Sequence, residues 1–297
     1  MILDGVEIED TFAEAFGMRA TRLVVTADSA RWARIAGETA TGFATSVIGC
    51  GLEAAIERDL PATETPDGRP GVSILIFAMN REALAKAVRD RVGQCVLTCP
   101  GTACYAGLDG GDPVPLGRVL SYFGDGYQAA KRLDGRRYWR LPVMDGEFLC
   151  EDTVGQTKAV GGGNFLILGR TRPAVLAAAE RAIVEMRKVA GVIMPFPGGI
   201  VRSGSKVGSK YKGLIASTND AYCPTLKGVA KTALPPEVDA VLEIVIDGLA
   251  DAMVGNAMAC GIRAACASSE GGILRISAGN YGGKLGAFHY HLRKLLV

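Results

Sequence analysis

The chain has 297 residues, of which 48% are hydrophobic and 22% charged, and its formal net charge is +2. A chain of this length forms one large domain or two ordinary ones, with enough apolar residues for a sizeable core. The near-balance of charge argues against nucleic acid as the main partner, because phosphate binding needs a clustered basic face, and it provides no broad basic surface for acidic lipids.

The beginning of the chain and its longest apolar stretch both indicate a protein that does not enter a membrane. The first ten residues are acidic where a secretory signal would be basic, and no apolar segment follows them. Residues 249–267 are small and apolar but are interrupted by Asp251, Asn256 and Arg263, whereas a membrane span needs about 20 nearly uncharged residues. We expect a cytoplasmic protein whose eight cysteines are reduced thiols.

Two strand–helix–strand units are expected in the first half of the chain. Asp28 or Ser29 is a suitable N-cap for the first helix, and Asn80 for the second. The expected elements are a strand at 23–26, a helix ending at Thr39, a returning strand at 45–50, a strand at 72–79, a helix ending at Arg91 and a returning strand at 95–98.

The second half repeats the same order. Pro173 is placed near the first position of a helix, where its missing N–H costs nothing. The expected elements are a strand at 164–168, a helix ending at about Val189, a strand at 192–194, a strand at 240–246, a helix at 249–267 and a strand at 273–277.

This order predicts an α+β fold with two ferredoxin-like (split βαβ) lobes, each an antiparallel sheet with helices on one face, in a duplicated architecture. Gly155 and the glycines at 161–163 interrupt the periodicity, so the lobes are expected at 1–155 and 156–297, the second with a long insertion at 195–236. The alternative is one doubly wound parallel sheet. It would need regular crossover helices, which the long segments without helical pattern do not offer.

The insertion is the most unusual segment and a candidate binding loop. Its glycines and serines, including Ser203 and Ser205, allow backbone amides to approach a ligand, and Arg202, Lys206 and Lys210 suit carboxylates or phosphates. It lacks the spacing of a Walker A loop. The competing interpretation is a solvated surface loop. Asn219 follows in the same insertion, where turn formation is the more common use of such a residue.

Glu243 interrupts the apolar run Val241-Leu242-Glu243-Ile244-Val245. An acid within a buried strand must be paired, protonated or facing a cleft, and burial raises its pKa toward neutrality. The sequence equally allows an edge strand on which Glu243 faces solvent.

Other chemistry-bearing residues give weaker signals. The three cysteines Cys95, Cys99 and Cys104 match no zinc spacing well, His289 and His291 share one strand face without a third ligand, and Cys223 has no histidine nearby in sequence. We interpret these residues as structural. Two glycine clusters, the first ending at Asn164 and the second at 278–284, either admit a ligand or only form tight turns.

Several long segments resemble one enzyme family over nearly the whole chain. The matching stretches are residues 5–16, 40–48, 65–71, 123–128, 195–201, 205–210, 216–224, 242–246 and 276–286. In them the chain is similar to formylmethanofuran:tetrahydromethanopterin formyltransferases. The modest positive charge makes it look more like the methylotrophic bacterial branch than the acidic proteins of methanogens.

The resemblance implies a direct transfer of a formyl group between N5 of tetrahydromethanopterin and the amine of a methanofuran-type carrier. It implies no metal and no bound cofactor, and it places Glu243 on the family's catalytic glutamate. We expect the substrates to be bound by the insertion and the first glycine cluster, through Arg202, Ser203, Ser205, Lys206, Lys210, Asn219 and Asn164.

The resemblance also implies a homotetrameric core with the substrate cleft near lobe and subunit contacts, and membership of a larger transferase–hydrolase complex that releases formate. Two rival functions remain: a non-catalytic scaffold subunit of such a complex, and a thiol- or metal-dependent enzyme using the cysteine cluster.

Overall fold

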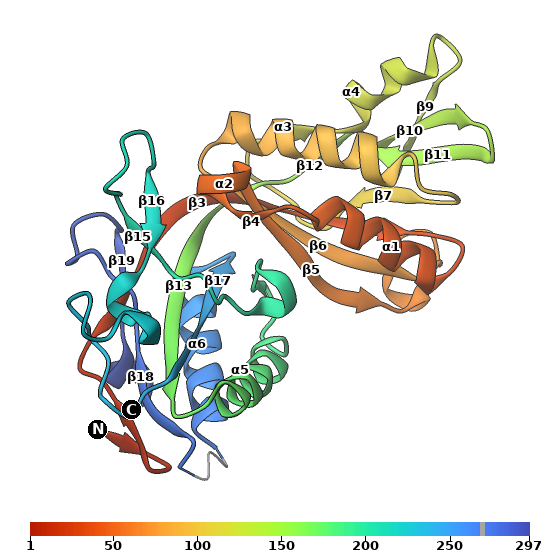
Figure 1. The fold of residues 1–297 in the computed structure, drawn as a ribbon. Helices are drawn as coiled ribbons and strands as arrows, with labels where there is room; N and C mark the ends of the chain where they lie inside the picture. Colours follow the sequence, from red (N-terminus) through yellow and green to blue (C-terminus); the bar gives the residue numbers. More distant parts are fainter. Residues whose placement is uncertain (268–270) are drawn as a thin grey trace. The chain divides into compact units, whose positions relative to one another are not determined.

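The computed structural model describes residues 1–267 and 271–297 (Figure 1). The chain divides into two compact units, which we call the N-terminal lobe (residues 18–159) and the C-terminal lobe (residues 1–17 and 160–297). The chain passes from the N-terminal lobe to the C-terminal lobe between residues 159 and 160, within the segment between Gly155 and Gly163 where the boundary was expected. Residues 1–17 differ from the expected division, because they belong to the unit formed by the C-terminal half.

The N-terminal lobe is an α+β unit. Its sheet has the order β5-β6-β3-β7-β11-β10-β9 and is antiparallel except between β7 and β11. Its strands are β3 (Phe12–Thr26, from residue 18), β4 (Thr45–Ser46), β5 (Leu52–Leu60), β6 (Gly71–Ala78), β7 (Ala103–Ala106), β8 (Val114–Pro115), β9 (Ala129–Leu133), β10 (Arg136–Val143), β11 (Gly146–Glu151) and β12 (Thr153–Val154). Its α-helices are α1 (Ala30–Thr41), α2 (Val47–Cys50), α3 (Arg81–Arg91) and α4 (Gly117–Leu120).

Side-chain caps begin the two main helices of this lobe as expected. Ser29 Oγ accepts a hydrogen bond from the backbone N–H of Trp32 (3.4 Å), and Asn80 Oδ1 accepts one from Ala83 (2.9 Å). Both helices then bury apolar faces against the sheet, through residues such as Ala36 and Leu84.

The predictions of two returning strands, at 45–50 and 95–98, were wrong. Residues 47–50 form a short helix capped by Ser46, and the returning strand is β5, which begins after Gly51 turns the chain with φ +78°. Residues 92–96 extend α3 as a π-helix, and the returning strand is β7. In both places an apolar run was short enough to suit either helix or strand, so periodicity could not decide between them.

The C-terminal lobe is also an α+β unit, with the strand order β1-β2-β18-β13-β17-β14. Among the strand pairs of this order that the structure describes, β2 and β18 run parallel and the others run antiparallel. Its strands are β1 (Ile2–Leu3), β2 (Val6–Ile8), the start of β3, β13 (Thr157–Gly169, from residue 160), β14 (Val192–Ile193), β15 (Ser205–Val207), β16 (Ala216–Thr218), β17 (Ala240–Gly248), β18 (Ile273–Ser277) and β19 (Phe288–His291). Its α-helices are α5 (Arg172–Met186), α6 (Asp251–Cys266) and α7 (Leu292–Leu295).

Helices α5 and α6 lie side by side on one face of this sheet (Figure 1). The core under them contains Phe165 and Ile167 from β13 and Ile244 and Ile246 from β17. The opposite face of the sheet carries a smaller apolar cluster around Leu166. Because alternate residues of a strand point to opposite faces, the helices leave this second face of β13 and β17 for other contacts. No helix among the described residues is long and apolar enough to cross a membrane.

Candidate active site

Glu243 lies on the face of β17 that the helices do not cover. Ile244 and Ile246 point into the helix-covered core, so Glu243 points the other way. Its cross-strand neighbour on β13 is Leu166. On its other side Glu243 exchanges both backbone hydrogen bonds with Val201 (2.8 and 2.9 Å), at the start of the insertion.

The carboxyl group of Glu243 keeps its proton to a higher pH than an ordinary glutamate does. The side chain is half-buried, and burial raises its pKa to about 7. Within residues 1–267 and 271–297, no hydrogen bond or ion pair of this carboxyl group is found, so no cation offsets the cost of its ionisation. This group can therefore serve as a proton or hydrogen-bond donor near neutral pH.

Polar residues of β13 and β18 share this face. Ser277 is opposite Leu166, and its hydroxyl lies 3.3 Å from that of Tyr222. Asn164 is only 7% exposed, and its amide is bound to main chain: Oδ1 accepts from Gly279 N–H (2.6 Å), and Nδ2 donates to the carbonyls of Gly162 and Gly279 (3.2 and 3.1 Å). Asn164 thus anchors the start of the second glycine cluster.

The insertion brings some of the expected binding residues near Glu243 and separates others. Arg202 and Ser203 are exposed and directly follow Val201, the backbone partner of Glu243. Lys206 lies on the β15–β16 hairpin and is paired with Asp220 at 2.5 Å. Lys210 is exposed in the connection between these two strands.

The remaining insertion residues have local contacts. Ser205 is exposed in β15. Asn219 is half-buried, its backbone N–H donates to the carbonyl of Gly204 (3.3 Å), and its own carbonyl accepts from the thiol of Cys223 (3.3 Å). These contacts order the turn after β16.

Sequence reasoning missed a second acid of this lobe. Glu14 lies in β3, is 1% exposed and accepts hydrogen bonds from four backbone N–H groups of residues 281–286. Gly286 is required there, because a Cβ atom would overlap the carbonyl oxygen of Ala15. The sequence pattern that could have revealed Glu14 is the same as for Glu243: a single acid within an apolar run, here Phe12-Ala13-Glu14-Ala15-Phe16.

The weaker candidates have structural surroundings. The rings of His289 and His291 both pack on Phe12, at centroid distances of 5.1 and 5.2 Å. Cys104 is buried beside its cross-strand partner Cys150, and Cys95 and Cys99 pack against the same core. No group of three or more His, Cys, Asp or Glu side chains suited to a metal ion occurs among the residues that the structure describes.

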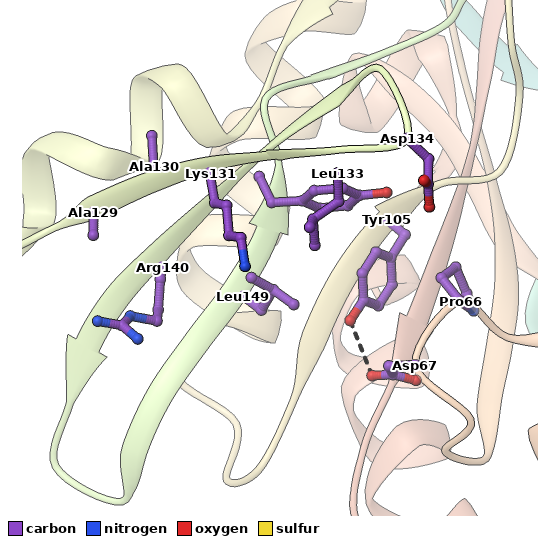
Figure 2. A pocket seen from close by; sticks show the side chains of 11 residues that line it. Pro66, Asp67, Tyr105, Ala129, Ala130, Lys131, Leu133, Asp134, Arg140 and Leu149 are labelled. Carbon is purple, nitrogen blue, oxygen red and sulfur yellow. Dashed lines mark hydrogen bonds between the residues drawn. The ribbon is translucent and has the colours of Figure 1, made fainter.

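The N-terminal lobe contains a separate cavity of about 500 Å³ on its sheet (Figure 2). Tyr105 and Tyr138 meet edge to face in its wall, with ring centroids 6.3 Å apart. The Tyr105 hydroxyl donates to Asp67 (3.0 Å), which Arg69 also binds. None of the expected site residues lines this cavity.

The fold and the site together define a two-lobed α+β protein with a candidate general acid on the face of the C-terminal sheet that the helices do not cover. The family described as formylmethanofuran-tetrahydromethanopterin formyltransferase matches residues 1–143, and that described as FTR, proximal lobe, matches residues 146–295. The chain therefore belongs to the formylmethanofuran–tetrahydromethanopterin formyltransferase family.

Relatives at high identity span the full chain. The formyltransferase of this name from Methylococcus capsulatus is 63% identical over 100% of both chains. A subunit of the formyltransferase/hydrolase complex from Methylorubrum extorquens is 56% identical over 99% of this chain and 97% of its own.

Two solved structures have the same fold. One is a chain of the formyltransferase/hydrolase complex from Methylorubrum extorquens, in complex with methylofuran, with a TM-score of 0.97 and 56% identity over 100% of this chain and 99% of that one. The other is the formyltransferase from Methanosarcina barkeri, with a TM-score of 0.94 and 46% identity over 100% of both. These relatives confirm the resemblance found in the sequence and the α+β class.

Proposed function

We propose that this chain transfers a formyl group directly between N5 of tetrahydromethanopterin and the amine of a methanofuran-type carrier, with Glu243 as the acid. The family and the names of its relatives support the reaction. The observation that supports the role of Glu243 is a carboxyl group of pKa about 7 on the face of the sheet that the helices do not cover. No cofactor takes part in this proposal.

The chemistry needs one donor that later takes a proton back. Toward the carrier, the neutral amine attacks the formyl carbon, a C–N bond forms, and the carbonyl oxygen becomes negative. Protonated Glu243 first donates a hydrogen bond to that oxygen. It then gives its proton to N5 as the bond between N5 and the carbon breaks, which leaves the Glu243 carboxylate. The ammonium formed on the attacking nitrogen returns a proton to the Glu243 carboxylate. A positioned acid of this kind contributes roughly 10²–10⁴-fold to the rate.

The substrate-binding residues remain those proposed from the sequence. Arg202 and Ser203 have the strongest support, since they follow the backbone partner of Glu243 and are exposed. Asn164 contributes by holding Gly279. The assignments of Ser205, Lys206, Lys210 and Asn219 rest on the family resemblance and on their place in the insertion.

Formyl transfer between the purified substrates tests the proposal, followed through the change in pterin absorbance. We expect transfer in wild type, and turnover of Cys223→Ser within about tenfold of it, because direct transfer needs no covalent enzyme intermediate. A formyl thioester trapped on any cysteine would overturn direct transfer. A chain without transfer activity would instead be the scaffold subunit, a role that the names of the full-length relatives do not favour.

We also propose ferredoxin-like lobes and a homotetrameric core. In each lobe the β-α-β-β-α-β segment has the strand order of the split βαβ sandwich, as in β14-β17-β13-β18.

A groove on the C-terminal lobe supports the homotetrameric core. It has a volume of about 440 Å³ and exposes Ala252 and part of Ala259 beside Gly255, small residues that allow close packing between chains.

Light scattering over a wide range of protein concentrations tests the oligomer. The expected result is the mass of four chains, and the mass of one chain at every concentration would contradict it.

The same proposal includes other subunits and a cellular location. Partner subunits of a transferase–hydrolase complex are supported by the Methylorubrum extorquens relative, which belongs to a complex of this kind. A cytoplasmic location is supported by eight cysteines that are all unpaired thiols, as expected in a reducing compartment.

A further inference from the structure

Glu14 binds one loop of the C-terminal lobe through both of its carboxylate oxygens. Oε2 accepts from the backbone N–H groups of Tyr281 and Gly283, each at 2.8 Å, and Oε1 accepts from Leu285 and Gly286, each at 2.5 Å. Four directional bonds from one short segment to one side chain fix the path of that segment. We call residues 280–286 the anchored loop.

The charge of Glu14 is permanent in the physiological range. Burial alone would raise the pKa of this carboxyl group, but the bonds from the four backbone N–H groups outweigh it and lower the pKa to about 2. Glu14 therefore does not give or take a proton near neutral pH. Its contribution is that of a fixed acceptor.

The anchored loop follows β18, which is separated from Glu243 on β17 by the single strand β13. Leu166 is the cross-strand neighbour of both Glu243 and Ser277, and Ser277 is the last residue of β18. Gly279, just before the loop, is held by Asn164 on β13. The loop thus has two anchors, one at its start and one along its length.

Tyr281 is the residue through which this loop can affect the chemistry. Its ring packs on Phe16 at a centroid distance of 6.1 Å, and Phe16 is on the same side of β3 as Glu14. Burial and the nearby charges of Glu243 and Glu14 raise the pKa of the Tyr281 hydroxyl. The phenol is therefore a neutral hydrogen-bond donor near neutral pH.

We propose that Glu14 is a positioning residue for formyl transfer, which holds Tyr281 beside Glu243 so that its hydroxyl donates to the oxygen that becomes negative in the tetrahedral intermediate. This inference rests on the proposed function. It also gives two glycines of the anchored loop a reason: Gly283 has a positive φ of 72°, and a Cβ atom at Gly286 would overlap the carbonyl oxygen of Ala15.

Glu14→Gln is the near-isosteric test. A glutamine keeps one acceptor oxygen, but its NH₂ group faces backbone N–H donors, so about two of them lose their partner in a covered site. We expect kcat to fall at least about tenfold with a smaller change in KM, and Tyr281→Phe to have a similar effect. Asp10→Asn, an acid-to-amide change at a side chain that is 78% exposed, is the matched control and should leave kcat within about twofold.

Three readouts separate positioning from a general loss of structure. The double variant should be no slower than Glu14→Gln by more than about twofold, because Glu14 acts through Tyr281. The alkaline limb of the kcat–pH profile should stay in place in Glu14→Gln, because burial and not Glu14 raises the pKa of Glu243, whereas a general loss of structure would expose Glu243 and move the limb to lower pH. Amide exchange at residues 281, 283, 285 and 286 should speed up in Glu14→Gln but not in Tyr281→Phe.

Independent, multiplying losses in the double variant would overturn the inference, as would an active wild type whose kcat is unchanged by Glu14→Gln. Failure of the proposed function has a different signature. Wild type would then be inactive, while amide protection of the anchored loop would still be lost in Glu14→Gln.

Discussion

Replacement of Glu243 by glutamine is expected to lower kcat at least about 100-fold and to change KM little, because the proton is needed mainly in the transition state. The structure provides the reason. Glu243 is on the face of β17 that the helices do not cover, and its burial holds the carboxyl group near the midpoint of its titration at neutral pH. Glutamine keeps the shape and a hydrogen-bond donor but cannot release a proton.

The pH dependence of kcat follows from the raised pKa. The active form is the protonated one, so kcat should be highest below pH 7 and should fall as pH rises through about 7. An unperturbed glutamate would lose its proton near pH 4.5 and would be inactive as a donor at neutral pH. This alkaline limb should be absent in Glu243→Gln.

The comparison with alanine separates the two roles of the acid. Near-normal kcat in Glu243→Gln with collapse in Glu243→Ala would mean that only a hydrogen bond is needed. Near-normal kcat in both would remove Glu243 from the mechanism. Asp239→Asn, just before β17, is the matched control, because its side chain is 73% exposed and a change there should have little effect.

Replacement of Phe165 by alanine is expected to lower the free energy of unfolding by about 3–5 kcal/mol, through loss of apolar burial and formation of a cavity. Phe165 is completely buried on the helix-covered side of β13. Its ring packs so closely against α6 that a Cβ atom added at Gly261 would lie 3.1 Å from it. The shift of the urea midpoint of the C-terminal lobe measures the loss.

Leu176→Ala on α5 is the control for this change. Its side chain is 44% exposed, and we expect a loss below about 1 kcal/mol. Where Phe165→Ala is still folded, kcat should stay within a few-fold of wild type, because Phe165 and Glu243 lie on opposite faces of the sheet. Equal destabilisation by both variants would contradict the described core.

Local signals in the sequence were sufficient for the main helices and for Glu243. Ser29 and Asn80 cap the helices that follow because a cap needs only a polar side chain and backbone N–H groups two or three residues ahead. Glu243 was recognisable because one acid interrupts a run of apolar residues. Whether it faced solvent or a protein surface could not be known without its neighbours, and the structure decided this through Leu166 and Val201.

The tertiary structure alone decided how distant segments meet. Glu14 and its amide partners are more than 260 residues apart in sequence, so no local pattern reveals that this acid holds a loop rather than a proton. Residues 1–17 belong to the C-terminal lobe because β2 pairs with β18, a contact between opposite ends of the chain. The sequence by itself determined the α+β class, the caps and the family, because these depend on neighbouring residues or on long matching segments. The surroundings of both acids depend on contacts far apart in the chain, and only folding brings these together.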